Sequence, residues 1–268
     1  MRPLVMVVLN VTPDSFSDRG RWLDPHAAVA HGMRMVDEGA DVVDVGGEST
    51  RPGAEPVPVD EELRRVVAVV EALAPHVRVS IDTRKAAVAE AAVAAGATLI
   101  NDVSASLASV AARWPGVGWV AMHMKGDPRT MQQSPAYDDV LGEVRYFLVE
   151  RATEARAAGV DEVWIDPGIG FGKTIDHNLL LLRHLADLVA TGFPVVVGTS
   201  RKSFLGRLTA TADGRPAPVE DRVEASVASA AWAVRQGAAM VRVHDVRETV
   251  EAVRLLAGAG AGAGAGTT

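Results

Sequence analysis

The chain has 268 residues, of which 48% are hydrophobic and 23% are charged, so it is long enough to bury one large core. It contains no cysteine, which excludes disulfides, thiolate metal ligands and cysteine nucleophiles. The formal net charge of −7 argues against nucleic-acid binding, because such binding needs a basic surface. The charge leaves room for an anionic small-molecule substrate, because a few arginines in a cleft dominate the local field.

The N-terminal segment runs directly into the apolar stretch Leu4–Leu9. It lacks the basic start, helical apolar run and small-residue cleavage site of a signal peptide. No apolar stretch is long enough to span a bilayer. We therefore expect a cytoplasmic protein with no membrane or nucleic-acid partner.

Eight short apolar runs along the chain predict β-strands. Most of them follow a glycine, such as Gly39, Gly96 or Gly159, of the kind that favours the left-handed position after a helix C-terminus. The runs are Leu4–Leu9, Val42–Val45, Val77–Asp82, Thr98–Val103, Trp119–His123, Val163–Asp166, Val195–Val197 and Met240–His244.

Helical patterns fill the intervals between these runs. Asp24 is predicted to cap the first helix, with Pro25 at its first position, and Asp60 to cap the second. Further helices are predicted within residues 86–95, 138–158, 178–190 and 221–236, and a proline-rich insertion at 209–218 precedes the last of these.

Alternating strands and helices with short helix-to-strand links predict an α/β protein with a parallel sheet. Eight such units predict a single-domain TIM (β/α)8 barrel over residues 1–257, with long strand-to-helix loops at its C-terminal face. The alternating alanines and glycines predict a low-complexity, disordered tail at 258–268.

The junction after the seventh predicted strand has an unusual charge pattern. Thr199 or Ser200 is predicted to cap the next helix. Arg201 and Lys202 then fall in its first turn, where the helix dipole disfavours cations. The pair indicates a site that needs positive charge, and a solvated surface position is the alternative for each residue.

Polar side chains fall at the ends of nearly all predicted strands, and in a barrel these ends meet at one mouth. They are Asn10, Asp44, Glu48, Asp82, Asn101, Asp102, His123, Asp166, Arg242 and His244. We expect Asp44, Asp102 and His123 to be hydrogen-bonded structural residues, which is the commoner use of single polar side chains. The acceptors of Asp82, Asn101 and Asp166 suit a heterocycle that is rich in N–H donors.

The cations of the mouth suit an anion, and they are Arg51, Lys202, Arg242 and His244. Asn10 is a candidate ligand for Mg²⁺, with the remaining ligands supplied by substrate phosphate and water. Zinc is not expected, because the histidines lack a third ligand. Residues 168–173 resemble a glycine-rich phosphate loop but lack the full spacing. An acceptor subsite and an anion subsite together predict a transferase or lyase that acts on a phosphorylated heterocycle.

Eight motifs in chain order resemble those of one enzyme family, the dihydropteroate synthases. They cover essentially the whole chain except the tail, and the combination is specific although several motifs are weak singly. The motifs are Asn10–Asp18, Gly46–Gly53, Ser80–Thr83, Asn101–Val103, Met122–Gly126, Asp166–Lys173, Ser200–Gly206 and Arg242–Asp245.

The resemblance implies a TIM barrel that forms a homodimer, uses Mg²⁺ and is a target of sulfonamides. It implies an enzyme of folate biosynthesis, a transferase that joins 6-hydroxymethyl-7,8-dihydropterin diphosphate to p-aminobenzoate and releases 7,8-dihydropteroate and pyrophosphate. In the implied mechanism, diphosphate leaves first, a pterin-stabilised cation forms at the exocyclic methylene, and the arylamine then attacks. Stabilisation of charge and positioning would supply the catalysis, because the arylamine is itself nucleophilic.

The same resemblance implies a role for each matching residue. The pterin would contact Asp82, Asn101, Val103, Met122, Asp166, Phe171, Gly198 and Lys202. The diphosphate would contact Asn10, Arg51, Arg242 and His244, with Mg²⁺ at Asn10. The p-aminobenzoate pocket would consist of Phe16, Thr50, Pro52, Lys202 and Ser203. The implied catalytic residues are Asn10, Asp82, Asp166, Lys202, Arg242 and His244.

Two alternative functions stay open on these residues. A methyltetrahydrofolate:corrinoid methyltransferase would share the contacts of Asp82, Asn101 and Asp166, but the Ser200–Ser203 and Thr50–Gly53 motifs favour the synthase. A non-catalytic pterin-binding paralogue is disfavoured because the anion-binding residues are retained.

Overall fold

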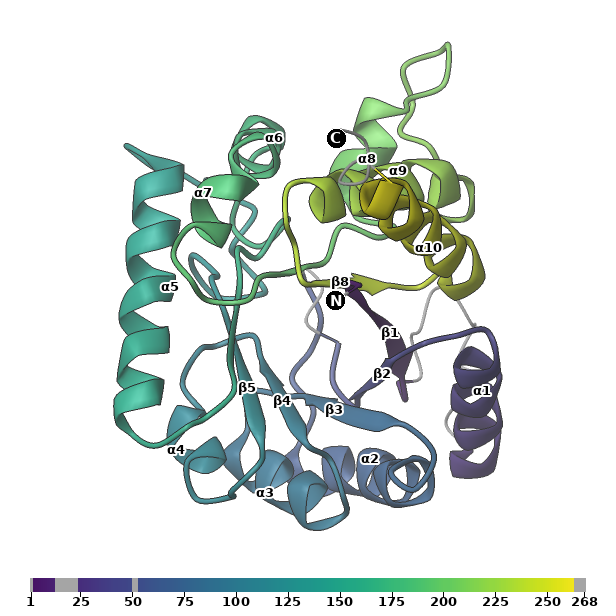
Figure 1. Ribbon diagram of the computed structural model, residues 1–268, viewed down its shortest axis with the longest axis vertical. Helices are drawn as coiled ribbons and strands as arrows, with labels where there is room; N and C mark the ends of the chain where they lie inside the picture. The colour runs from purple at the N-terminus through teal and green to yellow at the C-terminus, as the bar shows by residue number, and fades with distance from the viewer. Residues whose placement is uncertain (1, 13–23, 50–52, 263–268) are drawn as a thin grey trace, which may run out of the picture.

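The computed structural model describes residues 2–12, 24–49 and 53–262, and it shows an eight-stranded parallel barrel surrounded by helices (Figure 1). The prediction of an α/β TIM barrel is confirmed. The strands are β1 (Leu4–Asn10), β2 (Val42–Gly46), β3 (Arg78–Asp82), β4 (Leu99–Asp102), β5 (Gly118–Met122), β6 (Val163–Asp166), β7 (Val196–Val197) and β8 (Met240–Val243).

The strands pair in the order β6-β5-β4-β3-β2-β1-β8-β7. A single bridge between Ile165 and Val195 joins the two ends of this order and nearly closes the barrel. Alternate residues of each strand face the barrel axis and the surrounding helices. A small apolar layer therefore fills the barrel interior, and its members are Met6, Val42, Leu99, Val120, Trp164, Val196 and Met240. The larger apolar cluster lies between the strands and the helices.

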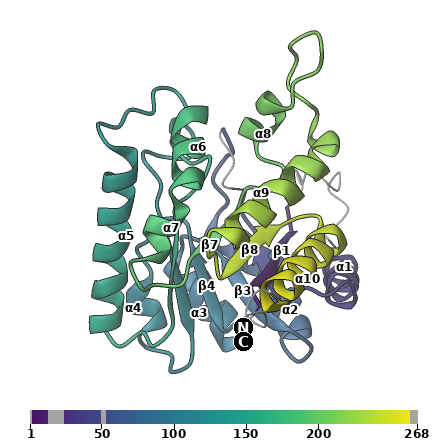
Figure 2. The same ribbon diagram turned by 45° about the horizontal axis from the view of Figure 1, so that its top comes forward.

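Helices follow the strands and cover the outside of the barrel, as both views show (Figures 1 and 2). The first five are α1 (Pro25–Asp37), α2 (Val59–Leu73), α3 (Ala86–Ala94), α4 (Ala108–Ala111) and α5 (Val140–Ala157). The others are α6 (Ile175–Arg183), α7 (Leu185–Val189), α8 (Ser203–Leu208), α9 (Val223–Arg235) and α10 (Val246–Gly262), with a 3₁₀ turn η1 (Val219–Arg222) before α9.

Two helix starts differ from the predictions. Asp24 does cap α1, since its side chain accepts from the His26 N–H at 3.1 Å. Asp60, by contrast, lies inside the first turn of α2, and Pro58 is at the N-cap. There its negative charge complements the helix dipole. The helix after β7 begins at Ser203 with Lys202 at its N-cap, so the predicted cap at 199 or 200 is wrong.

Two further segments lie beyond the barrel. The insertion at residues 209–218 projects away from the body of the molecule as a loop (Figure 2). α10 continues to Gly262, past the domain boundary expected at residue 257, because its alanines favour a helix that the glycines do not stop. In residues 2–12, 24–49 and 53–262, no helix is long and apolar enough to cross a membrane.

Candidate active site

The predicted site residues lie on the inward faces of the strands, above the apolar layer. Registered strand pairs align Asn10 with Gly46, Gly46 with Asp82, and Asp82 with Asn101. A further pair aligns Met122 of β5 with Asp166 of β6. Because side chains alternate along a strand, these residues point into the mouth of the barrel. The structure thus brings the predicted acceptor subsite together.

Arg242 crosses the barrel from β8 and binds two carboxylates. Its Nε donates to Asp44 Oδ2 and its Nη2 donates to Asp82 Oδ2, each at 2.6 Å. The Asn101 amide donates to the same oxygen of Asp44 at 2.9 Å. In the described part of the chain, Asp82 Oδ1 and Asp44 Oδ1 are buried without a hydrogen-bond partner. The cluster therefore retains acceptor capacity for a bound donor.

The cluster shifts the pKa values of its members. Burial raises the pKa of Asp82 to about 7, against the opposing effect of Arg242, and the nearby Asp44 adds to the rise. Burial disfavours the charge of Arg242, but Asp44 and Asp82 more than offset it, so its pKa is raised above the ordinary value. Arg242 is therefore a permanent cation, whereas Asp82 titrates near neutral pH.

Asp166 and Lys202 form the other side of the mouth, next to the loop after β6. Asp166 Oδ1 accepts from the Gly168 N–H at 2.7 Å. Lys202 Nζ donates to the Ile169 carbonyl and lies 4.8 Å from the centre of the Phe171 ring. Burial raises the pKa of Asp166, and burial lowers the pKa of Lys202 to about 8 although Asp166 opposes that shift.

The remaining pterin candidates surround this position. Val103 and Met122 are buried beside the polar row and Phe171 is half-buried. Gly198 is close to both cations: a Cβ atom at this residue would lie 3.6 Å from Arg242 Cβ and 3.8 Å from Lys202 Nζ. Gly198 therefore lies between the two cations.

The structure corrects the interpretation of Arg201. Its guanidinium binds the buried carboxylate of Asp245, with Nη2 at 2.5 Å from Oδ1, and its backbone N–H donates to Ser226 Oγ at 2.9 Å. Its φ angle is +58°, which is uncommon for a residue with a Cβ atom. Arg201 is thus part of the framework that turns the chain toward Lys202, not a solvated surface residue. His244 lies beside this turn, and both its N–H and its Nδ1 are 3.1 Å from Ser200 Oγ.

Four predicted site residues lie outside the described residues: Phe16, Thr50, Arg51 and Pro52. Ser203 is exposed at the first position of α8. The structure thus brings together the pterin candidates and Arg242, and it does not test the predicted p-aminobenzoate pocket.

Glu48, in the loop between β2 and α2, binds a later residue of the same loop and two residues that follow β3. This carboxylate accepts from the Val57 N–H at 2.8 Å, from Lys85 Nζ at 2.5 Å and from Arg84 Nε at 2.9 Å. Burial opposes its ionisation, but Lys85 and the Val57 N–H lower the pKa of Glu48 below its ordinary value. The β2–α2 loop is therefore fastened to the end of β3 by a charged carboxylate.

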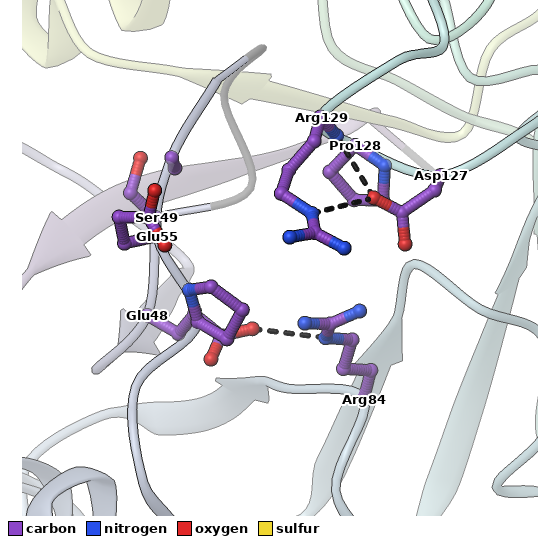
Figure 3. A pocket seen from close by; sticks show the side chains of 9 residues that line it. Glu48, Ser49, Glu55, Arg84, Asp127, Pro128 and Arg129 are labelled. Atoms are coloured by element: carbon purple, nitrogen blue, oxygen red, sulfur yellow. Dashed lines mark hydrogen bonds and ion pairs between the residues drawn. The ribbon is translucent and has the colours of Figure 1, made fainter.

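A hollow of about 250 Å³ lies between this loop and the β5–α5 loop (Figure 3). The guanidiniums of Arg84 and Arg129 enter it from two different loops. Each already binds a carboxylate through its Nε, Arg84 that of Glu48 at 2.9 Å and Arg129 that of Asp127 at 3.4 Å. The charges of the hollow are thus largely compensated by its own walls.

The predicted metal ligand, Asn10, lies in the described part of the chain. Within residues 2–12, 24–49 and 53–262, no group of three or more His, Cys, Asp or Glu side chains is arranged around a metal position. The Asn10 amide oxygen lies over Gly46, 3.5 Å from where a Cβ atom of that glycine would be. A hard cation fits here only with most of its ligands supplied by substrate oxygens and water.

Sequence reasoning missed one contributor to the site, and it left the direction of one lysine open. Asp44 is the hydrogen-bonded residue that was predicted, but its partners are Arg242 and Asn101, which makes it part of the site. Its position two residues before Gly46 on an inward face was an available signal. Lys173, at the end of the glycine-rich run, is buried in the protein, and its Nζ lies 3.0 Å from Nδ1 of His123, which is the hydrogen-bonded structural residue expected from the sequence. Burial lowers the pKa of His123 to about 3, so its ring is neutral and Nδ1 accepts.

Known proteins resemble this chain over most of its length. A family model described as "Pterin binding enzyme" matches residues 6–244. The dihydropteroate synthase of Mycobacterium leprae is 50% identical over 260 residues, which cover 94% of this chain and 92% of that protein. The Yersinia pestis dihydropteroate synthase, solved in complex with a sulfonamide drug, superposes with a TM-score of 0.90 at 46% identity, covering 97% of this chain and 95% of that one. The Thermus thermophilus enzyme, solved with 4-aminobenzoate, has a TM-score of 0.84 at 45% identity and covers 96% and 94%.

Proposed function

The chain belongs to the dihydropteroate synthase family of pterin-binding enzymes, and from that premise we propose how its residues share the reaction. The enzyme condenses 6-hydroxymethyl-7,8-dihydropterin diphosphate with p-aminobenzoate, which yields 7,8-dihydropteroate and pyrophosphate. The observation that carries the assignment of roles is the convergence of Asp82, Asn101, Asp166 and Lys202 around Arg242 at the mouth of the barrel.

The pterin occupies the floor of the mouth. Asp166 and Asn101 meet the amino and ring N–H groups of the heterocycle, and Asp82 offers its unpartnered Oδ1. Lys202 donates to a ring acceptor, and the side chains of Val103, Met122 and Phe171 enclose the faces of the ring. Gly198, which lies close to Lys202 and Arg242, adds no side chain to the space that the ring occupies.

The diphosphate extends from the pterin toward β1 and β8. Arg242 and His244 contact it, with Asn10 from β1 and Arg51 from the β2–α2 loop. Arg242 is held rigidly by Asp44 and Asp82, so its guanidinium is oriented before the substrate arrives. The bound diphosphate also compensates the positive charge that Arg242 carries at the mouth.

Mg²⁺ is proposed as the cofactor, with Asn10 as its protein ligand. When bound, the ion adds positive charge to the leaving diphosphate. An amide oxygen is a ligand of the type that suits this hard cation, and substrate phosphate oxygens and water would supply its other ligands.

The p-aminobenzoate pocket is proposed to consist of Lys202 and Ser203 together with Phe16, Thr50 and Pro52. Lys202 then lies between the two substrates. Its pKa of about 8 leaves the ammonium largely protonated at neutral pH, where it suits a carboxylate or a carbonyl oxygen.

The reaction is a dissociative substitution in this proposal. The bond between the exocyclic methylene and the diphosphate oxygen breaks, and its electron pair leaves with pyrophosphate toward Arg242. The carboxylates of Asp82 and Asp166 stabilise the pterin cation that remains. The amine of p-aminobenzoate then forms the C–N bond, and the resulting ammonium releases a proton to solvent.

We also propose a homodimer in the cytoplasm. Three large apolar side chains of neighbouring helices are exposed, with Leu179 and Leu180 of α6 at 40% each and Trp232 of α9 at 47%. The Trp232 ring donates to the Leu182 carbonyl at 2.9 Å, which places the two helices side by side. Sedimentation should show a dimer that Leu180→Glu converts to monomer, and a parent chain that sediments as monomer would overturn this assignment.

The activity is tested by pyrophosphate release. Release should require pterin diphosphate, p-aminobenzoate and Mg²⁺ together, and chelation of the metal should abolish it. Asp166→Asn and Lys202→Met should each weaken binding of 6-hydroxymethylpterin, measured by calorimetry without turnover. Unchanged pterin affinity in both variants would refute the assignment of these residues.

A further inference from the structure

Lys173 is a buried lysine to which the proposed mechanism gives no role. It is 3% exposed at the end of the loop between β6 and α6. Its Nζ lies 3.0 Å from His123 Nδ1, 3.3 Å from the His123 carbonyl, 3.0 Å from the Gly168 carbonyl and 3.1 Å from the Phe171 carbonyl. All of these acceptors are neutral groups, and they belong to two loops, the β5–α5 loop and the β6–α6 loop.

These two loops pack backbone against backbone. Gly168 and Gly172 both have a φ angle of +62°. A Cβ atom at Gly168 would lie 1.9 Å from the His123 carbonyl oxygen, and one at Gly172 would lie 2.2 Å from that of Lys125. The glycines permit this approach, and the amine of Lys173 joins the two backbones where they meet.

The β5–α5 loop also holds the glycine loop through side chains. Tyr137 donates its hydroxyl to the Gly172 carbonyl at 2.9 Å. Gln132 donates its amide to the Gly170 carbonyl. Together with Lys173, these donors bind carbonyls along the loop from residue 168 to residue 172.

The other side of the same loop holds the proposed pterin ligands. The Gly168 N–H donates to Asp166 at 2.7 Å, and the Ile169 carbonyl accepts from Lys202 Nζ. The Phe171 ring lies below that ammonium group. A shift of the glycine loop would therefore displace Asp166 and Lys202 together.

We propose that Lys173 is a positioning residue for pterin binding, with His123 as its partner. Its amine fixes the glycine loop against the β5–α5 loop, and the loop in turn fixes the Ile169 carbonyl and the Gly168 N–H that orient Lys202 and Asp166. This inference rests on the proposed role of those two residues in pterin binding. It assigns Lys173 no contact with the substrate.

The test is calorimetric titration of folded protein with 6-hydroxymethylpterin. Lys173→Met keeps the length of the side chain and removes its donors. We expect the Kd for the pterin to rise at least tenfold while the stoichiometry of the folded protein stays near one. A purely structural role would lower the stoichiometry, which reports the folded fraction, and leave the Kd unchanged, and that result would overturn the proposal.

A second variant covers the case in which Lys173→Met does not fold. The double variant Gln132→Met with Tyr137→Phe removes two donors to the glycine loop from its outer side and leaves no buried charge. We expect a two- to fivefold rise in the pterin Kd with unchanged stoichiometry. An unchanged Kd in this folded variant would count against the proposal.

The matched control is Lys125→Met, at the exposed lysine of the β5–α5 loop. Its Nζ donates to the Ala136 carbonyl and to Glu143, not to the glycine loop. Its pterin Kd should stay within twofold of the parent value. If Asp166→Asn and Lys202→Met weaken pterin binding while Lys173→Met does not, the positioning role fails and the proposed function stands. If none of the three weakens it, the proposed function fails as well.

Discussion

Arg242 and Lys202 come from neighbouring strand ends of the same mouth, but different groups hold them. Arg242 binds the carboxylates of Asp44 and Asp82, each at 2.6 Å. Lys202 binds the Ile169 carbonyl, and Lys173 behind it binds carbonyls and a neutral histidine. We call Arg242 with Asp44 and Asp82 the charge-paired region. We call Lys202 with Lys173 the dipole-held region, because backbone carbonyls and a neutral histidine accept their hydrogen bonds.

The difference determines what each region can do. Paired carboxylates raise the pKa of Arg242, which suits a group that must remain charged beside a leaving diphosphate. Burial lowers the pKa of Lys202 to about 8 and that of Lys173 to about 7, although the charge of Asp166 opposes both shifts. The first region therefore supplies a permanent charge, whereas the second supplies cations whose charge depends on pH and on geometry.

The largest expected effect comes from removing the permanent charge. Arg242→Ala should lower kcat about 10²–10³-fold, the usual cost of losing one group that stabilises developing charge. It also leaves Asp44 and Asp82 buried without their partner, which costs about 3–5 kcal/mol of stability unless one of them takes up a proton. We expect the fold to survive, because Asp82, whose pKa is raised by burial to about 7, can take up a proton.

Pyrophosphate release under steady-state conditions measures this effect, and circular dichroism checks the fold. Arg247→Ala on α10 is the control, since Arg247 is exposed and forms an ion pair with Glu251 one turn away on the same helix. Turnover of Arg242→Ala close to that of the parent would refute the role of this residue.

The next largest effect is expected in the dipole-held region. Lys202→Met should lower kcat/KM about 10–100-fold, because a cation at the junction of the two substrates is lost while the other residues stay in place. The loss should be smaller than that of Arg242→Ala if the leaving group carries most of the charge in the transition state. A larger loss of activity in Lys202→Met than in Arg242→Ala would show that the dipole-held region, not the charge-paired region, contributes most to catalysis.

Stability should depend on pH in opposite ways in the two regions. Folding raises the pKa of Asp82 from 3.8 to about 7, so the folded state holds an extra proton and the free energy of unfolding falls as pH rises through that interval. Folding lowers the pKa of Lys202 from 10.5 to about 8, so the unfolded state holds the extra proton and stability rises between those values. Burial also lowers the pKa of Lys173 to about 7, so this residue too should make the free energy of unfolding rise with pH above that value.

Urea unfolding between pH 8 and pH 10 tests this reasoning. The free energy of unfolding should rise with pH in the parent, and the rise should be shallower in Lys202→Met. Lys125→Met, whose lysine is exposed, should retain the slope of the parent. Equal slopes in the parent and in Lys202→Met would contradict the lowered pKa of Lys202.

The two regions also differ in how far the sequence predicts them. Apolar runs with glycines between them predict the eight strands, and alternation along those strands places Asp82, Asn101 and Asp166 in one mouth. The pairing of Arg242 with Asp44 spans most of the chain, and only the closed barrel brings those residues together. The sequence names both as strand-end residues but does not show that they bind each other.

The dipole-held region is harder to predict, because its acceptors are backbone carbonyls that carry no sequence signal. The run from Gly168 to Lys173 resembles a phosphate loop by composition, and the direction of the Lys173 side chain depends on how closely the β5–α5 loop approaches. The helix start after β7 shifted for a similar reason. Arg201 binds Asp245 and Ser226, and these tertiary contacts hold the chain outside the helix until Ser203.

The smallest effect is expected from Asp44→Asn, which changes the charge of the paired region without removing its hydrogen bonds. An asparagine oxygen can still accept from Arg242 or Asn101, so the fold should be kept and kcat should fall by about twofold to tenfold. Asp44 raises the pKa of the neighbouring Asp82, so that pKa should fall in the variant. The acidic limb of the pH profile of kcat/KM should therefore move to lower pH, whereas an unmoved limb would show that Asp44 and Asp82 do not act as one unit with Arg242.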